Sequence, residues 1–154
     1  MKIAIDAMGG DFAPLEPILG SIEAVRANEH IEVVLVGDEQ QIFNILEARN
    51  EAKNPRISVH HASQVIGMDE HPGQALRKKK DASIVVATSL VRDNVCDAVI
   101  APGSTGAAVA AALFGLGRIK GVDRPVIATP MPTVSGITAV SYTHLRAHET
   151  LRHL

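Results

Sequence analysis

Two acids and two glycines form a short motif directly after the first hydrophobic strand that the sequence predicts. Asp6 and Asp11 enclose a turn that contains Gly9 and Gly10. Glycine lets the backbone come close to a bound group and adopt a positive φ without a Cβ clash. In open α/β sheets, ligands bind at the carboxyl ends of the strands. The whole motif therefore predicts a ligand-binding edge, although the glycines alone would more often mark an ordinary strand-to-helix turn.

A second motif of small residues follows another hydrophobic strand and opens a helix: Gly103, Ser104, Thr105 and Gly106. Free backbone N–H groups and the positive end of the helix dipole favour an anion at such a position. The motif lacks the lysine of a Walker loop and the spacing of GxGxxG, so it matches neither nucleotide signature. Two interpretations are equally open. The loop binds phosphate, or Ser104 only caps the helix while the glycines allow close packing.

Cations and histidines elsewhere could complete such a site. Arg118 and Arg124 flank a short turn, and the planar guanidinium suits phosphate. Either arginine could instead pair with Asp123, and for at least one of them this is the more usual outcome. His61 ends the third predicted strand and is a candidate general base, with a structural role as the alternative.

The remaining reactive residues favour structural roles. The run Arg77–Lys80 could attract an acidic carrier protein or a phosphate, but such runs more often form a solvated surface. Cys96 lies beside a buried strand without a histidine partner motif and is best explained as a core thiol. His144 and His148 stand four residues apart, yet no acid or cysteine completes a metal-site spacing. We therefore expect no metal.

Composition limits the class of protein. Aromatic residues make up only 3% of the 154 residues, so the core must consist of aliphatic side chains, which suits parallel strands that are buried on both faces. The formal charge of −2 argues against nucleic-acid binding. The N-terminus has no signal-peptide pattern, and no apolar run approaches the length of a membrane-spanning helix. These features lead us to expect a cytoplasmic protein.

Strand and helix patterns alternate along the chain, which predicts right-handed crossovers and a mostly parallel sheet with helices on both faces. Asp38 and Asp81 are expected to cap the second helix and the helix at 83–94. The stretch at 67–80 is expected to be irregular, with a short helix near 74–79. The predicted strands are 2–7, 31–37, 56–60, 97–101 and 126–129, and the other predicted helices are 14–28, the one after Asp38 and 104–116.

The composition and the pattern of the sequence change after Gly136. Residues 137–154 contain three of the seven histidines and the only tyrosine, and they do not continue the alternation. We therefore divide the chain into an α/β part at 1–136 and a tail at 137–154, and we hypothesise that the tail is not native sequence or is loosely packed.

Five strings, in order, resemble one family: DAMGGD, LVGD, VIGMDEHPGQALRKKKDAS, GSTGA and LGRIKGVDRPVIATPMPT. They closely resemble the bacterial phosphate acyltransferases of phospholipid synthesis, the PlsX family. The resemblance covers residues 1 to about 136. Family members are longer, so the chain is similar to their N-terminal half.

The resemblance implies a fold and a reaction. The fold is a Rossmann-like three-layer sandwich similar to that of isocitrate dehydrogenase and phosphotransacetylase, here truncated. The reaction passes a long-chain acyl group from acyl carrier protein to inorganic phosphate. The resemblance also implies a homodimer without metal or organic cofactor, and it leaves open a peripheral association with the inner face of the plasma membrane. Two alternatives remain, an acyl-CoA donor and a non-catalytic half-domain that binds phosphate.

The resemblance also implies roles for the residues named above. The loop 103–106 would hold phosphate, with Arg118 or Arg124 neutralising its charge, and the 6–11 turn would line the same cleft. Ser104 stands where many relatives carry asparagine, which puts any contact of that amide in doubt. The catalytic group is unassigned, with Asp6, Asp11 and His61 as candidates.

Overall fold

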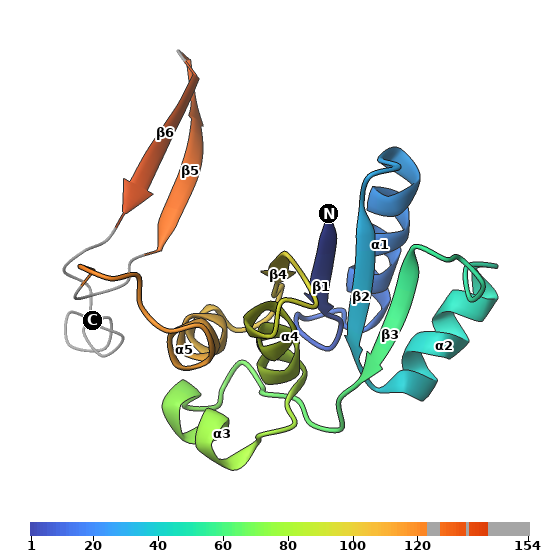
Figure 1. The fold of residues 1–154 in the computed structure, drawn as a ribbon, viewed down its shortest axis with the longest axis horizontal. Helices are drawn as coiled ribbons and strands as arrows, with labels where there is room; N and C mark the ends of the chain where they lie inside the picture. The colour runs from blue at the N-terminus through green and yellow to red at the C-terminus, as the bar shows by residue number, and fades with distance from the viewer. Residues whose placement is uncertain (123–126, 135, 142–154) are drawn as a thin grey trace. The chain divides into compact units, whose positions relative to one another are not determined.

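A computed structural model of the chain describes residues 1–122, 127–134 and 136–141 (Figure 1). The chain divides into two compact units, Met1–Gly117 and Arg118–Leu154. The first unit contains β1 (Lys2–Asp6), α1 (Leu15–Ala27), β2 (Glu32–Gly37), α2 (Glu39–Ala48), β3 (Ile57–His61), α3 (Pro72–Lys78), α4 (Ser83–Arg92), β4 (Ala98–Ile100) and α5 (Thr105–Gly115). The second contains β5 (Ala128–Thr133) and β6 (Gly136–Ser141).

The first unit is built on a parallel sheet with the strand order β3-β2-β1-β4. Ala4 in the middle of β1 lies opposite Val34 of β2 on one side and Val99 of β4 on the other. The chain thus moves outward from β1 to β3 and then returns to place β4 on the free side of β1. The predicted α/β class and its parallel strands are confirmed.

Helices cover both faces of this sheet because side chains alternate between the faces along each strand. Ile3 and Ile5 of β1 pack in one hydrophobic cluster with residues of α1 and α2, such as Ile18. Ala4 packs in another cluster with Ala87 and other residues of α4. The two clusters and the sheet between them make the three-layer sandwich that the sequence predicted.

The contacts of α5 with α3 and α4 depend on two glycines of α5. A Cβ placed on Gly115 of α5 would lie 2.8 Å from Thr88 Cγ2 of α4, and one placed on Gly106 would lie 2.8 Å from Pro72 Cγ of α3. Both distances are shorter than real Cβ contacts, so α5 can approach its two neighbours this closely only without these side chains.

One of the two predicted helix caps is correct. Asp38 accepts a hydrogen bond from the backbone N–H of Gln41 at 2.9 Å and caps α2. The prediction for Asp81 is wrong, because Ala82 is the N-cap of α4. The Asp81 carboxylate instead accepts two hydrogen bonds from Ser63, one from its backbone N–H at 2.7 Å and one from its hydroxyl at 2.5 Å. These bonds tie the chain after β3 to the start of α4.

The second unit differs from the prediction. The expected fifth strand of the parallel sheet is instead β5 of an antiparallel hairpin with β6. Pro130 and Pro132 explain this, because a strand with two prolines cannot donate from those positions to a neighbour and is confined to sheet edges. β6 occupies 136–141, where the tail was expected to begin. His144 and His148 lie outside the described residues.

No helix in the described ranges combines the length and the apolar character that crossing a membrane requires.

Candidate functional site

The two glycine motifs of the sequence meet in the structure. A Cβ placed on Gly103 would lie 2.9 Å from the Cα atom of Gly9, and one placed on Gly9 would lie 2.9 Å from the backbone nitrogen of Gly103. The two loops therefore pack backbone against backbone, with no room for a side chain. Gly10 adopts φ +103° with its Cβ position 3.3 Å from the carbonyl oxygen of Pro102. The positive φ favours glycine here, and the carbonyl oxygen leaves little room for a Cβ.

This meeting point is the place where the strand order of the sheet reverses. β1 and β4 are parallel neighbours, but the chain leaves β1 toward β2 on one side and leaves β4 into α5 on the other. Ligands of doubly wound α/β proteins bind in the crevice at such a switch point, outside the carboxyl ends of the strands. The predicted ligand-binding edge therefore lies at the position that this topology favours.

Ser104 caps α5, as one of the two interpretations expected. Its hydroxyl oxygen accepts from the backbone N–H of Ala107 at 3.3 Å, and its carbonyl oxygen accepts from the backbone N–H of Ala108 at 2.9 Å. The N–H groups of Thr105 and Gly106 occupy the first helical positions, where no partner within the same helix exists. A capping hydroxyl can still donate its own hydrogen. Capping and anion binding are thus compatible at this helix start.

The buried carboxylate of Asp6 fixes the first loop by a hydrogen bond to its backbone. Its side chain faces the same side of the sheet as Ala4, toward α4, and the residue is only 5% exposed. Oδ1 accepts from the backbone N–H of Met8 at 3.2 Å, and Oδ2 lies 2.9 Å from the Cβ position of Gly9. Burial raises the pKa of this carboxyl. The nearby Ser83 hydroxyl counters part of that rise in pKa without reaching full hydrogen-bond geometry with any described residue.

Asp11, at the other end of the motif, has a different environment. It lies on the surface, whereas Asp6 is enclosed beneath the turn. The two acids that look equivalent in the sequence therefore have separate positions, one within the scaffold of the loop and one open to solvent.

Met8 and Gly37 form a contact that the sequence analysis missed. A Cβ on Gly37 at the end of β2 would lie 2.5 Å from Met8 Cγ and 2.7 Å from its Sδ. The Met8 side chain thus packs over the end of β2 and holds the first loop across the neighbouring strand. A glycine that directly ends an aliphatic strand was the available signal.

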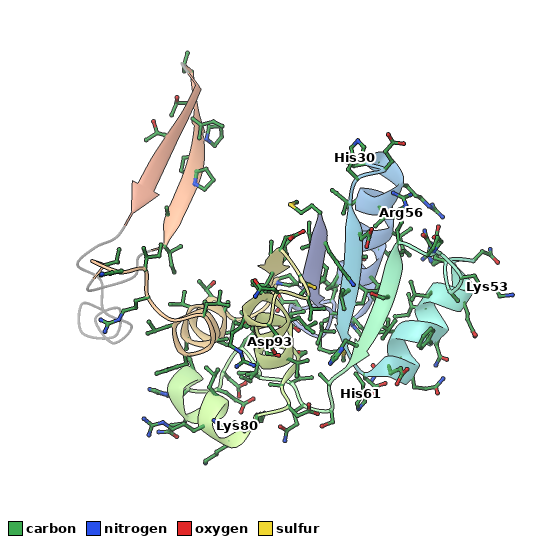
Figure 2. All side chains as sticks on the ribbon, in the orientation of Figure 1. His30, Lys53, Arg56, His61, Lys80 and Asp93 are labelled. Carbon is green, nitrogen blue, oxygen red and sulfur yellow. The ribbon has the colours of Figure 1, made fainter. Side chains whose placement is uncertain are left out.

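His61 does not lie beside the two loops. It ends β3, which is separated from β1 by β2 (Figure 2). Its Nδ1 accepts from the backbone N–H of Glu39 at 3.4 Å, so the ring lies at the start of α2. Arg118 belongs to the second unit, and Arg124 lies outside the described residues. The proposed roles of all three side chains stay predictions.

The start of α3 contacts the second loop, which the sequence analysis did not identify. Pro72 lies against Gly106 of the second loop, and α3 begins at this proline. Glu70 fixes the segment, because its Oε1 accepts from the backbone N–H of Gly67 at 2.7 Å and from Lys79 Nζ at 2.6 Å. Lys79 also donates to the carbonyl of Val65 at 2.7 Å. One cation of the basic run therefore has a structural role.

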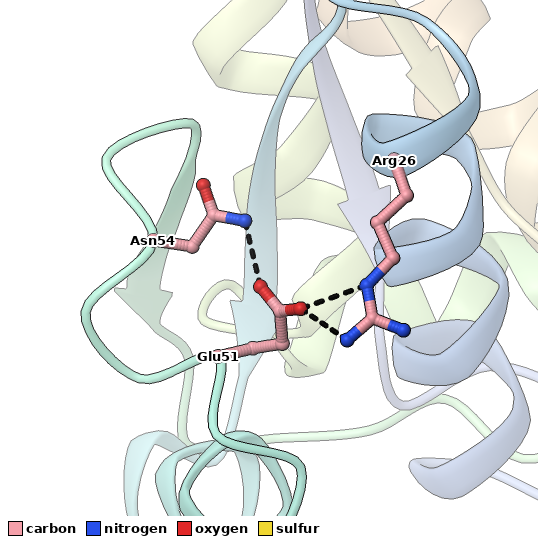
Figure 3. Close-up of polar contacts among 3 residues, drawn as sticks. All are labelled: Arg26, Glu51 and Asn54. Atoms are coloured by element: carbon pink, nitrogen blue, oxygen red, sulfur yellow. Dashed lines mark hydrogen bonds and ion pairs between the residues drawn. The ribbon is translucent and has the colours of Figure 1, made fainter.

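A polar cluster around the buried Glu51 serves the fold. Glu51 accepts from Asn54 Nδ2 at 2.7 Å and from Arg26 Nε at 2.9 Å (Figure 3). These bonds, with the Asn54 bond contributing most, hold the pKa of Glu51 below its usual value. Because the cluster joins the ends of α1 and α2, it stabilises the packing of these helices on the sheet.

Other reactive groups are placed away from the loops. Cys96 is buried against α4, and burial raises the pKa of its thiol, which fits the predicted core role. Within the part of the chain that the structure describes, no three His, Cys, Asp or Glu side chains are arranged to hold a metal ion.

The sheet order and the paired glycine loops define a doubly wound α/β protein with a loop-lined switch point. The sequence profile of the fatty acid synthesis protein family matches residues 1–142, and the chain belongs to this family. The match extends through β6, beyond the expected boundary at 136.

Similar curated proteins carry one shared name. A phosphate acyltransferase of Desulforamulus reducens is 50% identical over 140 residues, which are 91% of this chain and 41% of the relative. One of Heliobacterium modesticaldum is 52% identical over 136 residues, 88% of this chain and 40% of the relative. One of Pelotomaculum thermopropionicum is 51% identical over 140 residues, with shares of 91% and 40%. The chain thus spans about two fifths of the length of these relatives.

Proposed function

We propose that the family-length protein containing this chain transfers a long-chain acyl group from acyl carrier protein to inorganic phosphate. A phosphate oxygen attacks the thioester carbonyl, the carbon–sulfur bond breaks, and the carrier thiol leaves as acyl phosphate forms. The observation that supports this most is the backbone contact between Gly9 and Gly103, which joins the two loops at the switch point. The shared name of the relatives agrees with the reaction class.

In this proposal the chain binds phosphate mainly through its backbone. The N–H groups of Thr105 and Gly106 donate to the anion, and the positive end of the α5 dipole favours its charge. Ser104 donates its hydroxyl hydrogen while it caps the helix. Aiming phosphate at a carbonyl requires positioning and electrostatic stabilisation more than covalent catalysis. Asp6 then acts by holding the first loop, and Asp11 is the surface acid that can meet a substrate.

Several further features belong to the same proposal. Arg118 or Arg124 neutralises the bound phosphate, the family-length protein is a homodimer of the cytoplasm, and it associates peripherally with the membrane where phospholipid synthesis uses its product. The 154-residue chain alone is expected to be inactive, because the surface for the acyl chain and some catalytic groups are expected to lie beyond it.

The test is an assay of the family-length protein in which acyl carrier protein thiol is released in the presence of phosphate. The wild type should release thiol only when phosphate is present. Changing Ser104 and Thr105 together to Ala should raise the KM for phosphate about tenfold, equivalent to about 1.4 kcal/mol. An unchanged dependence on phosphate concentration would count against the phosphate role of this loop.

The same assay separates the alternatives. If acyl-CoA is used as well as the acyl carrier protein thioester, the protein acts as a phosphotransacetylase-like enzyme. If phosphate binds but neither donor reacts, the chain belongs to a phosphate-binding module without transferase activity.

A further inference from the structure

The exposed side of α3 carries a cluster of cations. Gln74, Arg77 and Lys78 follow the i, i+3, i+4 spacing that places side chains on one face of a helix, and Ala75 and Leu76 are buried on the opposite face. Lys80 follows directly after the helix and is also exposed. We call Arg77, Lys78 and Lys80 the basic face.

Nearby carboxylates compensate this charge only in part. Among the described residues, the recorded ion pairs include none of the three cations of the basic face. Glu70 is paired with the cation Lys79. Asp81 accepts only from the neutral Ser63, so its charge remains. Asp69 and Asp81 thus place two negative charges in the same segment as the three positive charges of the basic face. In a chain with a formal charge of −2, this leaves a local excess of positive charge.

The basic face is physically connected to the proposed phosphate site. Pro72 at the start of α3 touches Gly106 at the start of α5. α3 has seven residues, so its far end lies about 10 Å from that contact at 1.5 Å per residue. An open pocket of about 210 Å³ lies against α3 and is lined by Glu70, His71, Gln74, Ala75, Lys78 and Lys79. Lys79 and Glu70 are paired with each other in this pocket, so Lys78 and the amide of Gln74 are what it offers to the side chains of a partner.

We propose that the basic face is the docking surface for the acidic surface of the protein that carries the acyl group. This inference rests on the proposed function, because it assigns a surface to the acyl donor of the same site. Complementary charge across an interface speeds encounter and fixes orientation. Docking here brings the thioester within reach of the loop 103–106. An anionic lipid surface is the less suitable partner, since lipid-binding basic clusters have four to eight cations and the basic face has three.

The experiment compares two matched charge reversals in the family-length protein. Arg77→Glu with Lys80→Glu changes one arginine and one lysine of the basic face. Arg49→Glu with Lys53→Glu makes the same charge change at exposed positions near the opposite edge of the sheet. Figure 2 shows Lys53 and Lys80 on separate parts of the first unit. Arg77→Gln with Lys80→Gln serves as the milder variant if the double reversal unfolds.

Two measurements are made on each variant. The first is kcat/KM with the carrier-bound acyl thioester and with the same acyl group on free pantetheine, at low and high salt. The second is the affinity for the carrier protein without an acyl group, which requires no turnover. The basic-face reversal should lower carrier-dependent kcat/KM about tenfold, abolish its salt dependence and weaken carrier binding. Turnover of acyl pantetheine should change less than about twofold, and the control variant should resemble the wild type.

Three results would overturn the proposal: equal losses with both donors, equal losses in both variants, or lost binding to anionic phosphatidylglycerol vesicles with unchanged carrier kinetics. Failure of the proposed function is recognised separately. In that case the wild type makes no acyl phosphate from either donor, while the carrier-binding measurement still shows whether the basic face docks the carrier.

Discussion

Hydrophobic side chains are buried to different degrees near β2 and near the edge strand β4 of the parallel sheet. On the side of β2, residues such as Ile18, Leu35 and Ile42 are completely buried. On the side of β4, Ile100 is 51% exposed and Phe114 of α5 is 71% exposed. Helix α5 is almost entirely apolar, yet it buries only Ala107 and Ala111.

This difference separates the two loops of the candidate site. The 6–11 loop follows β1 in the well-buried part of the sheet, where Asp6 accepts from its backbone and Met8 packs against Gly37. The 103–106 loop opens a helix whose apolar surface is only partly covered in this chain. Because the chain spans about two fifths of its relatives, we expect the rest of a family-length protein to cover β4 and α5.

The largest expected effect contrasts one side chain from each side of the sheet. Leu35→Ala should lower the free energy of unfolding of this chain by about 3 kcal/mol, because it leaves a cavity in a packed core. Phe114→Ala should lower it by less than about 0.5 kcal/mol, because its ring is mostly in solvent. Urea unfolding followed by circular dichroism measures both. Similar losses for the two variants would show that α5 is covered as well as β2.

The next effect concerns the contact between the loops. Gly103→Ala should destabilise the chain by about 1–3 kcal/mol, because the new Cβ meets the backbone of Gly9 and one loop must shift. Gly20→Ala is the matched control, since Gly20 lies in α1 with no atom near its Cβ position. It should instead stabilise by about 0.5–1 kcal/mol. Equal effects of the two substitutions would mean that the loops do not pack as described.

Two buried carboxyl groups should give opposite pH dependence. Because folding raises the pKa of Asp6, its contribution is most favourable below the unfolded value of 3.8 and is lost as pH rises through the folded pKa. Because folding lowers the pKa of Glu51, its contribution is present above the unfolded value of 4.5 and is lost as pH falls through the folded pKa.

The corresponding variants make this measurable. The stability of Asp6→Asn relative to wild type should increase as pH rises above about 4, because the wild type loses the contribution of Asp6 there. The stability of Glu51→Gln relative to wild type should decrease as pH rises toward about 4, because the wild type gains the contribution of Glu51 there. The effect at Glu51 should be about 1 kcal/mol or less, since its partner Arg26 is 61% exposed and solvent screens the pair. Urea unfolding at a series of pH values provides the curves, and parallel curves for the two variants would refute the assigned environments.

The smallest effect compares two helix caps. Ser104→Ala should cost about 0.5 kcal/mol, because its hydroxyl accepts a long bond of 3.3 Å at the partly covered helix α5. Asp38→Ala should cost more, because its carboxylate accepts at 2.9 Å at the start of α2. Thermal unfolding of the two variants ranks them, and the reverse order would weaken the contrast between the two sides.

Local sequence signals predicted most of the fold. Aliphatic runs located β1, β2 and β3, and the 3.6-residue spacing of Ile18, Ile22 and Val25 located α1. Two strong motifs were correctly assigned to the carboxyl ends of strands. These features depend on neighbouring residues in the chain, so a single sequence displays them directly.

Long-range packing could not be predicted in the same way. Nothing local shows that β4 pairs with β1, that Met8 covers Gly37 or that Ser63 takes up Asp81. The expected fifth parallel strand was wrong. The aliphatic residues favoured a strand, but Pro130 and Pro132 have no backbone N–H to donate to a neighbouring parallel strand. Likewise, the burial that distinguishes Asp6 from Asp11 arises only when α4 packs on the sheet.

The most direct test of the central claim is a titration of the isotopically labelled chain with inorganic phosphate, followed by the backbone amide resonances. The two loops should respond as one site, so that Gly10, Thr105 and Gly106 shift together with a single Kd. Gly103→Ala should abolish these shifts, and Gly20→Ala should retain them. Shifts confined to Arg77–Lys80, or no saturable shift in either loop, would contradict the account.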